Sequence, residues 1–579
     1  MMRPDSPYCT TVSEITWQQD TPSSVEFEDS YWSEGDPTQE KQWVFPGQHQ
    51  LPARAEQADL IVLLELGFGF GHNFLQTVAL WEASTTTTQL HYIAVERSPP
   101  CLAALQRVHA LTETVAAKRL LAIYPAGIEA WHVVWFTDRI RLTLIFEDAQ
   151  TALPKIDAKV DAFYLDGFKP SQNPELFNRF IFEGMRRLAQ PGASVSTYSV
   201  AGVVKQGLKA AGFRIEKRPG WGRKRELLFA QAPGDWRGQR LRRASVQIIG
   251  AGIAGQSLVT SLNRFGIEPM VLADPNQPGA SSQPALNIYP QLSLQRDRQS
   301  EYSIAGCYFT LHNQPGVQQK PLTWRSATKA KIERMQRLCQ LFPSDYLEQI
   351  DNEVIYHQAG IWQSRPPAGL RAAKVCQMTP AGGQMRLEDA AGQTLSQADI
   401  TLLAAGSGML ALTRLKLNTV RGQSIQIQSN RVLPEFLIGD ISITHLGGLD
   451  FLVGSTYALD VTDQATRSAD SDRLMADLAQ TLQHSDFTLE SAHAGIRAAF
   501  ADRIIGIGQL PIQALKVSRP SPVAAGNSEP APECYALMGL GSHGATHAPL
   551  AAEAIASSLC GAPSPLPREL SHLTRLNRF

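Results

Sequence analysis

The sequence predicts an α/β protein with two domains of the doubly wound type, in which helices flank a mostly parallel sheet. Two segments carry this prediction, because residues 58–81 and 244–266 each read as an apolar strand, a glycine-rich turn and a helix. Between them, residues 231–243 are polar and basic and contain Pro and Gly, which predicts a linker. A chain of 579 residues also exceeds what a single hydrophobic core organises.

These observations predict where the domains begin and end. We expect a first domain over 1–235, a basic linker over 236–243 and a second domain over 244–579. The second domain is expected to contain a Rossmann part and an inserted antiparallel α+β substrate part. Their expected bounds are about 244–305, 396–412 and 500–560 for the first, and about 306–395 and 413–499 for the second.

The composition is that of an ordinary globular protein, with 43% apolar and 18% charged residues. The net charge of −1 predicts neither a nucleic-acid nor a membrane partner by itself. The seven cysteines are scattered and form no CxxC pair, so we expect reduced thiols and no metal site. The polar beginning and the lack of a long apolar run predict a soluble cytoplasmic protein.

The first glycine-rich turn places Gly67, Gly69 and Gly71 at alternate positions, directly after a strand that carries Glu65. Glycine lets the backbone bend tightly against a ligand, because no Cβ collides with it. The spacing G-x-G-x-G differs from the phosphate-binding G-x-G-x-x-G and is typical of class I methyltransferases. This turn therefore predicts a Rossmann-like domain that binds S-adenosylmethionine.

Further acids follow the next strands of this domain: Glu96, Asp148 and Asp166. A single acid after a strand often only caps the following helix, but four in register with the turn favour a binding site. We expect Glu96 to bind the ribose hydroxyls and Asp148 the adenine amino group. Asp166 is the expected catalytic residue, because a carboxylate can orient an acceptor amine and take its proton.

The second turn, with Gly250, Gly252 and Gly255, is a G-x-G-x-x-G between a strand and a helix. Such a turn binds a pyrophosphate at the helix N-terminus. Asp274, 19 residues after Gly255, ends the next strand and is expected to bind a ribose. The sequence therefore predicts a dinucleotide site.

Two later segments favour FAD over NAD as the dinucleotide. Residues 400–406 form an apolar run that ends at Gly406. Residues 538–544, which include Gly541, His543 and Gly544, precede a helix expected to start near Pro549. A turn of this kind can lie against a flavin and aim a helix N-terminus at it.

Two side chains in this domain admit more than one interpretation. His543 can act as a base or pack on the cofactor, and we assign it to flavin contact. Arg497 can anchor a substrate carboxylate with two hydrogen bonds, or it can be a buried partner of Asp502. The sequence does not decide between the two roles of Arg497.

A basic strip lies between Arg214 and Arg243, where ten Lys/Arg face three acids and give a local net charge of +7. Clustered cations bind phosphate backbones, and an interleaved aromatic side chain can stack on an unpaired base. The alternative is a solvated face of a strand and linker. The expected nucleic-acid contacts are Trp221, Arg223, Lys224 and Arg225.

Taken together, these motifs resemble the family of bifunctional tRNA 5-methylaminomethyl-2-thiouridine biosynthesis proteins, MnmC, over nearly the whole chain. In the first half the resemblance rests on the turn at Gly67, residues 165–170 with Asn173-Pro174, and residues 222–226. In the second half it rests on the turn at Gly250 and on residues 420–423, 495–497 and 548–553.

The resemblance implies a class I methyltransferase domain followed by an FAD domain of the amino-acid or amine oxidase type. It further implies a two-step reaction at the wobble uridine of tRNA. The FAD domain removes the carboxymethyl group of a carboxymethylaminomethyl side chain by way of an imine, and the methyltransferase domain methylates the primary amine that results. The resemblance also implies that Asp166 is the base. A monomer that binds neither DNA nor a membrane is expected.

One stretch departs from the family pattern, because residues 279–287 lack an Asn–Arg pair and a glycine. This departure concerns the flavin contacts of the oxidase half. Two alternatives to this two-step reaction stay open. In the first, the chain is a fused small-molecule amine oxidase and N-methyltransferase. In the second, which the departure at 279–287 makes conceivable for the oxidase half, one half is inactive and serves to bind tRNA.

Overall fold

The computed structural model describes residues 6–32, 37–110, 114–125, 127–222, 225–277, 279–517 and 532–578. The chain folds into two compact units. The N-terminal unit comprises Met2–Arg242 and Gly561–Glu569, and the C-terminal unit comprises Arg243–Cys560 and Leu570–Phe579. Among the helices of the described residues, none has the length and apolar character needed to cross a bilayer.

An eight-stranded sheet forms the centre of the N-terminal unit, in the order β10-β11-β9-β8-β4-β5-β7-β6. Its middle strands from β9 to β7 are parallel, whereas β6, β10 and β11 pair with their neighbours in antiparallel fashion. The strands are β4 (Leu60–Leu66), β5 (Gln89–Glu96), β6 (Trp131–Trp135), β7 (Ile140–Phe146), β8 (Val160–Leu165), β9 (Ala189–Thr197), β10 (Arg214–Pro219) and β11 (Glu226–Gln231).

The order of the strands determines where a ligand can bind. β4 is buried along its whole length and lies between β5 and β8, so the chain winds in opposite directions from it. In doubly wound sheets ligands bind beyond the carboxyl ends of the strands at this switch point. In this unit that position is the turn that begins at Gly67.

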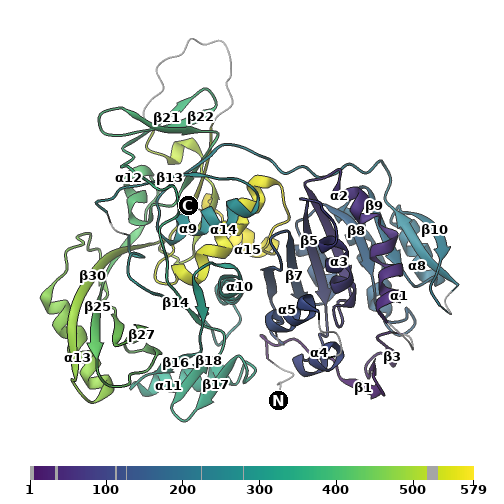
Figure 1. The fold of residues 1–579 in the computed structure, drawn as a ribbon, viewed down its shortest axis with the longest axis horizontal. Coiled ribbons are helices and arrows are strands. Elements are labelled where there is room, and N and C mark those ends of the chain that lie inside the picture. Colours follow the sequence, from purple (N-terminus) through teal and green to yellow (C-terminus); the bar gives the residue numbers. More distant parts are fainter. Residues whose placement is uncertain are drawn as a thin grey trace. The chain divides into compact units, whose positions relative to one another are not determined.

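Helices cover both faces of this sheet (Figure 1). On one face α3 contacts α1 and α5, and on the other α7 contacts α6 and α8. The helices are α1 (Pro37–Val44), α3 (His72–Glu82), α5 (Val115–Ile123), α6 (Ala149–Lys155), α7 (Arg179–Leu188) and α8 (Gly202–Ala210). In α7 the buried residues Ile181, Met185 and Leu188 recur at helical spacing, which gives the helix one apolar face toward the sheet.

The segment expected as a linker is bound to the N-terminal unit through Asp161 on β8. The buried carboxylate of Asp161 accepts hydrogen bonds from the backbone N–H of Val62 (2.8 Å), the indole of Trp236 (2.7 Å), and the amides of Gln239 (2.7 Å) and Gln190 (2.6 Å). Burial raises the pKa of Asp161, and these donors oppose that rise. The carboxylate therefore joins the sheet to the chain that leaves it.

A returning segment, residues 561–569, also belongs to this unit. The buried guanidinium of Arg141 donates to the Pro563 carbonyl (2.6 Å), and the Ser564 N–H donates to the Asp157 carbonyl (3.1 Å). The motifs do not predict this return, because residues 561–569 carry no periodic pattern.

The C-terminal unit contains a six-stranded sheet in the order β20-β13-β12-β24-β32-β31, parallel except at β31. Helix α9 (Ile253–Arg264) contacts α14 (Gly544–Cys560), which also contacts α10 (Arg298–Asn313). The strands are β12 (Val246–Ile249), β13 (Met270–Ala273), β20 (Arg371–Ala372), β24 (Ile400–Leu403), β31 (Gly506–Gln509) and β32 (Glu533–Met538). The helix expected to start near Pro549 begins five residues earlier, at Gly544.

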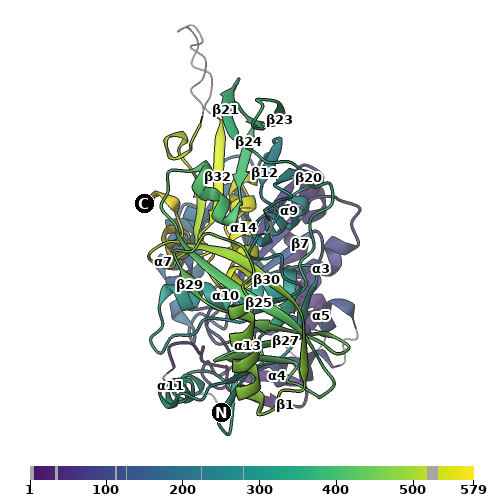
Figure 2. The same cartoon turned by 90° about the vertical axis from the view of Figure 1, so that its left-hand side faces the viewer.

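A larger mixed sheet forms the second layer of the C-terminal unit. The long strands β25 and β30 pair over their whole lengths, and α13 (Ser468–Leu482) packs on β25 (Figure 2). The strands are β16 (Leu322–Arg325), β17 (Leu347–Ile350), β18 (Glu353–Tyr356), β25 (Asn418–Ser429), β26 (Phe436–Gly439), β27 (Ser442–Gly447), β28 (Asp450–Gly454), β29 (Ala458–Leu459) and β30 (Phe487–Ala499).

Residues 371–398 differ from the expected division of this unit. β20 extends the six-stranded sheet, and the hairpin of β21 (Gln377–Ala381) and β22 (Gln384–Glu388) buries Met378, Met385 and Leu387 against residues of that sheet. These strands therefore pack with the Rossmann part, whereas the sequence placed them in the inserted substrate part.

The carboxylate of Asp161 gives a stability prediction. Asp161→Ala leaves four donors without their acceptor, and we expect the free energy of unfolding to fall by about 3–5 kcal/mol. Asp157→Ala removes an exposed ion pair with Arg568 and an electrostatic interaction with Arg187, and it should cost less than about 1 kcal/mol. Calorimetric unfolding of the two variants and the parent measures the difference. Equal losses in the two variants would contradict the role given to Asp161.

Candidate active sites

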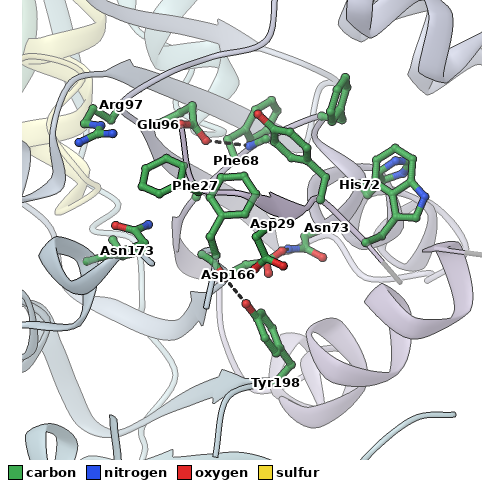
Figure 3. A pocket seen from close by; sticks show the side chains of 18 of the residues that line it. Phe27, Asp29, Phe68, His72, Asn73, Glu96, Arg97, Asp166, Asn173 and Tyr198 are labelled. Atoms are coloured by element: carbon green, nitrogen blue, oxygen red, sulfur yellow. Dashed lines mark hydrogen bonds between the residues drawn. The ribbon is translucent and has the colours of Figure 1, made fainter. Parts of the chain in front are cut away.

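A cavity of about 260 Å³ lies beyond the carboxyl ends of β4, β5 and β8 in the N-terminal unit (Figure 3). The structure brings five of the sequence-predicted residues to its wall: Gly67, Gly69, Glu96, Asp148 and Asp166. Glu65 and Gly71 lie behind the wall, where Glu65 is fully buried and Gly71 precedes α3.

Gly67 allows the ends of β4 and β8 to approach one another. Its φ is +93°, and a Cβ at this position would lie 1.7 Å from the carbonyl oxygen of Asp166. The Asp166 N–H in turn donates to the Leu66 carbonyl (3.0 Å). No other residue fits here without moving the backbone that carries Asp166.

Glu96 is held at the end of β5 by backbone donors. Its carboxylate accepts from the N–H of Gly69 (2.9 Å) and from the N–H of Ser98 (2.9 Å). Burial raises the pKa of Glu96, and the two N–H groups oppose that rise. The carboxylate thus faces the cavity in a fixed orientation, as a ribose-binding acid requires.

Asp148 has a second role besides lining the cavity. It is the N-cap of α6, and its carboxylate accepts from the Gln150 N–H (2.8 Å). One carboxylate oxygen suffices for the cap, so the other can accept a further donor.

Asp166 belongs to a buried network that the sequence did not reveal. The side-chain amide of Asn73 donates to Asp166 Oδ2 (2.8 Å) and also to Glu65 Oε1 (2.7 Å), and Figure 3 shows Asn73 and Asp166 directed toward one another. Tyr92 donates to the other oxygen of Glu65 (2.7 Å). Burial, followed by the charge of Asp166, raises the pKa of Glu65 to about 8.

Lys41, on α1, forms an ion pair with Asp166 Oδ2. Neither Lys41 nor Asn73 is marked by a motif. Asn73 follows the glycine turn by two residues, and α1 is distant in sequence from every strand-end acid. Only the fold brings them to Asp166.

Aromatic side chains form another part of the wall. Phe27 stacks on Phe168 with ring centroids 4.7 Å apart, and Tyr31 lies edge-on to Phe168 and to Phe70. All four residues line the cavity. A wall of this kind suits a planar ring, because aromatic faces stack on the faces of bases.

A second cavity, of about 1130 Å³, lies in the C-terminal unit at the carboxyl ends of β12, β13 and β24. Its volume exceeds the range that pockets for drug-sized molecules usually span. Nearly all of the residues predicted for this site line it: Gly250, Gly252, Asp274, Gly406, Arg497, Gly541, His543 and Gly544. Gly255 does not; it lets α9 pack closely, because a Cβ there would lie 2.0 Å from the Gly250 carbonyl oxygen.

The start of this site repeats the close approach seen at Gly67. Gly250 has a φ of +112°, and a Cβ on it would lie 2.4 Å from the Ala404 carbonyl oxygen. At the N-terminus of α9 the Ile253 N–H donates to the hydroxyl of Ser281 (3.2 Å). Ser281 belongs to the stretch 279–287 that departs from the family pattern, and most of this stretch lines the cavity.

Asp274 lies directly after β13, and its side chain is mostly buried. It accepts from the Asn276 N–H (2.9 Å), which fixes one of its oxygens. Lys374 lies 3.8 Å from its other oxygen.

His543 and Arg497 face the same cavity. Burial, followed by the charge of Arg497, lowers the pKa of His543 to about 4, so the imidazole is neutral at pH 7. Arg497 donates to the Ser455 hydroxyl (2.8 Å). The alternative pairing of Arg497 with Asp502 is wrong, because Asp502 is paired with Arg578 (3.1 Å).

The basic strip is partly neutralised on β10. Lys217 pairs with Glu226 (2.7 Å), and Arg218 pairs with Glu216 (3.0 Å). Arg225 is exposed, whereas Arg223 and Lys224 lie outside the described residues.

Trp221 forms an exposed aromatic pair with Trp43, which the sequence did not single out. The two rings are 6.2 Å apart, and the side chains are 38% and 41% exposed. The indole N–H of Trp43 donates to the Pro219 carbonyl (3.0 Å), which fixes the ring beside β10.

Comparison with known proteins finds a described family in each half of the chain. Residues 112–233 match a family described as S-adenosyl-L-methionine-dependent methyltransferase, and residues 368–558 match one described as FAD dependent oxidoreductase. Two curated relatives are both named tRNA 5-methylaminomethyl-2-thiouridine biosynthesis bifunctional protein MnmC. The chain is 31% identical to the one from Aromatoleum aromaticum, over 95% of this chain and 94% of the relative. It is 32% identical to the one from Caulobacter vibrioides, over 98% of each.

Among solved structures, an iminodiacetate oxidase from Chelativorans sp. BNC1 aligns with a TM-score of 0.45 and 18% identity. The alignment covers 57% of this chain and 98% of that one.

The two cavities fit the cofactors that these families use. In the first, the close approach at Gly67 and the fixed carboxylate of Glu96 suit S-adenosylmethionine. In the second, the close approach at Gly250, the acid at Asp274 and the turn before α14 suit FAD.

Glu96 supplies a binding prediction. Glu96→Gln keeps the shape of the side chain but removes its charge, and we expect the affinity for S-adenosylmethionine to fall about 10- to 100-fold. Calorimetric titration measures the change. Glu82→Gln, on an exposed helix end, is the control and should bind as the parent does. Unchanged affinity in Glu96→Gln would exclude Glu96 from the ribose site.

Proposed function

The chain belongs to the family of bifunctional tRNA 5-methylaminomethyl-2-thiouridine biosynthesis proteins, and on this premise we propose that it modifies the wobble uridine of tRNA in two steps. The C-terminal unit oxidises the C–N bond between the carboxymethyl group and the nitrogen of a 5-carboxymethylaminomethyl side chain, and water hydrolyses the oxidised product. The carboxymethyl group then leaves as glyoxylate and a primary amine remains. The N-terminal unit then methylates that amine.

The observation that carries this proposal is the carboxylate of Asp166 at the wall of the first cavity. Methylation of an amine needs a group that orients the nitrogen and takes its proton, and an aspartate at this position supplies both. The amine itself requires a preceding step that breaks a C–N bond. The FAD unit of the same chain belongs to a class that performs such oxidations.

In the first step the protein residues bind and orient the substrate. FAD, when bound, supplies the oxidising power by taking two electrons from the substrate carbon next to nitrogen. We assign Arg497 to the carboxylate of the carboxymethyl group, because its guanidinium faces the cavity and Ser455 fixes one end of it. The neutral imidazole of His543 adds no positive charge that would compete with Arg497 for this carboxylate.

In the second step Asp166 acts on the acceptor amine. Asn73 holds Asp166 Oδ2, and this bond directs the carboxylate toward the cavity. The nitrogen lone pair forms the new N–C bond as the S–C bond breaks, and the positive charge moves from sulfur to nitrogen. A carboxylate next to that nitrogen stabilises the charge as it develops.

We propose that the anticodon region of the tRNA contacts the N-terminal unit beside β10. The exposed pair of Trp43 and Trp221 offers aromatic faces for an unpaired base, and Arg225 offers a cation for the backbone. Trp43 lies on the same helix as Lys41, which reaches Asp166, so this surface continues to the wall of the first cavity.

Two variants separate the two steps. Asp166→Asn should slow methylation about 10²- to 10⁴-fold, so tRNA treated with it accumulates the aminomethyl nucleoside. Arg497→Met should slow the first step about 100-fold or more and leave the carboxymethylaminomethyl form. Mass spectrometry of the wobble nucleosides detects each form. Each variant is the control for the other, because Asp166→Asn still produces the aminomethyl form and Arg497→Met still methylates tRNA that is supplied with this form. Full methylation by Asp166→Asn would contradict the assignment of the base.

The aromatic pair and the cation beside β10 should affect tRNA binding in two different ways. Trp221→Ala or Trp43→Ala should weaken tRNA binding about 5- to 100-fold at every salt concentration. Arg225→Gln should instead reduce the slope of log affinity against log salt by about one. Filter binding over a salt series measures both. Phe180→Ala, at a 70% exposed aromatic on α7, is the control and should change neither quantity.

A further inference from the structure

Lys41 makes a contact that neither the sequence motifs nor the family description accounts for. Its ammonium pairs with Asp166 Oδ2 at the cavity wall, and the two side chains are only 12% and 13% exposed. The ammonium also lies 5.3 Å from the centre of the Phe45 ring. A lysine in such a position is held by the fold, because it has exchanged most of its water for these partners.

The ion pair leaves one of the two carboxylate oxygens of Asp166 for a ligand. Within the part of the chain that the structure describes, the hydrogen bonds from Asn73 and Lys41 reach only the Oδ2 atom of Asp166. Oδ1 therefore remains to accept an N–H of the acceptor amine. An amine bound at Oδ1 lies within a few ångströms of the Lys41 ammonium, because the two oxygens share one carbon.

Two buried titratable groups close to Lys41 carry little charge at pH 7. Glu65 has its pKa raised to about 8, so it is mostly neutral at pH 7, and Lys41 opposes that rise. Burial, followed by the nearby His109 and Lys41, lowers the pKa of His72 to about 3. His72 is therefore also neutral at pH 7.

The other charged and titratable groups that face this position lie further along the cavity wall. Burial, followed by the charge of Asp166, raises the pKa of Tyr198, so this phenol stays neutral. At the rim Lys169 is paired with Asp29. Glu40, the neighbour of Lys41 on α1, and Glu175 also line the cavity, as do Glu96, Arg97 and Asp148 further from Lys41.

The pairing of Lys41 with Asp166 bears on the state of the acceptor. A primary alkylamine is mostly protonated at neutral pH, and the protonated form has no lone pair to attack a methyl group. An unpaired carboxylate would bind that protonated form and stabilise it, because an opposite charge within about 6 Å favours the ionised state by about 1–3 pH units. A nearby cation has the opposite effect.

Resting on the proposed function, we propose that Lys41 is a positioning residue that keeps Asp166 from trapping the acceptor amine in its protonated form. The ammonium of Lys41 balances the charge of Asp166, so the acceptor loses one proton to solvent and binds as the neutral amine, with an N–H directed to Oδ1. The lone pair then forms the N–C bond as the S–C bond breaks. The product nitrogen carries the positive charge that sulfur has lost, and it then gives its proton to Asp166, which is the proton that Asp166 takes as the base.

The test is the pH dependence of methyl transfer in a single turnover. The probe is full-length protein with radiolabelled S-adenosylmethionine and tRNA whose wobble uridine carries the aminomethyl group. In Lys41→Met the acidic limb of the rate profile should move about one to two pH units upward, because the unbalanced carboxylate then holds the protonated amine. Lys41→Arg keeps the charge and should keep the limb of the parent.

A purely structural role for Lys41 would lower the rate without moving the limb. Lys155→Met is the matched control, because Lys155 also pairs with a carboxylate of this unit, that of Glu147, but lies outside the cavity wall. If Lys41→Met does not fold, Lys41→Gln gives the same reading.

An unmoved limb in the uncharged variant overturns the proposal. A limb that moves downward overturns it as well, since Lys41 would then take part as a base. If the parent itself does not methylate this tRNA, the proposed function fails together with the role of Lys41. If the parent methylates it and the limb does not move in Lys41→Met, only the role of Lys41 fails.

Discussion

The amide of Asn73 donates to two buried carboxylates, and the methyltransferase site depends on this interaction. Glu65 is the penultimate residue of β4 and Asp166 follows β8, so the amide connects two neighbouring strands at the switch point of the sheet. Without such a donor, a buried oxygen of each carboxyl group would lose a hydrogen-bond partner. Gly67 makes the arrangement sterically possible, because it admits the backbone of Asp166 where any Cβ would collide. The orientation of the catalytic carboxylate thus follows from the topology of the sheet.

The C-terminal unit uses the same principle for a larger ligand. Gly250 admits the backbone at the end of β24 as Gly67 admits the end of β8, and the acid at Asp274 follows the neighbouring strand. The units differ in what surrounds the switch point. The N-terminal cavity is lined by aromatic rings and a charged network, whereas the wall of the C-terminal cavity extends onto a second, mixed sheet that contributes Arg497. This difference suits the N-terminal cavity to the methylation of one amine nitrogen. It suits the C-terminal cavity to binding a flavin together with its substrate.

Residues within or directly after the parallel strands could be predicted from the sequence, and residues brought in from elsewhere could not. Glu96, Asp166 and Asp274 follow apolar runs, and the topology of a doubly wound sheet requires such residues to meet at one edge. Lys41, Asn73 and Trp43 carry no comparable signal, because helix packing alone decides which faces of α1 and α3 reach the cavity. The sequence predicts the start of α14 near Pro549, because proline is common in the first turn of a helix, but the helix begins at Gly544 and contains Pro549. The family pattern does not predict the contact that residues 279–287 make. Ser281 accepts a hydrogen bond from the N-terminus of α9, although this stretch departs from the pattern.

The central claim is that one unit makes the amine that the other methylates. Mass spectrometry of wobble nucleosides from tRNA incubated with the parent protein, with and without S-adenosylmethionine, tests it most directly. We expect the aminomethyl nucleoside to accumulate without S-adenosylmethionine and to be replaced by the methylaminomethyl nucleoside when S-adenosylmethionine is added. Persistence of the carboxymethylaminomethyl nucleoside under both conditions would contradict the claim.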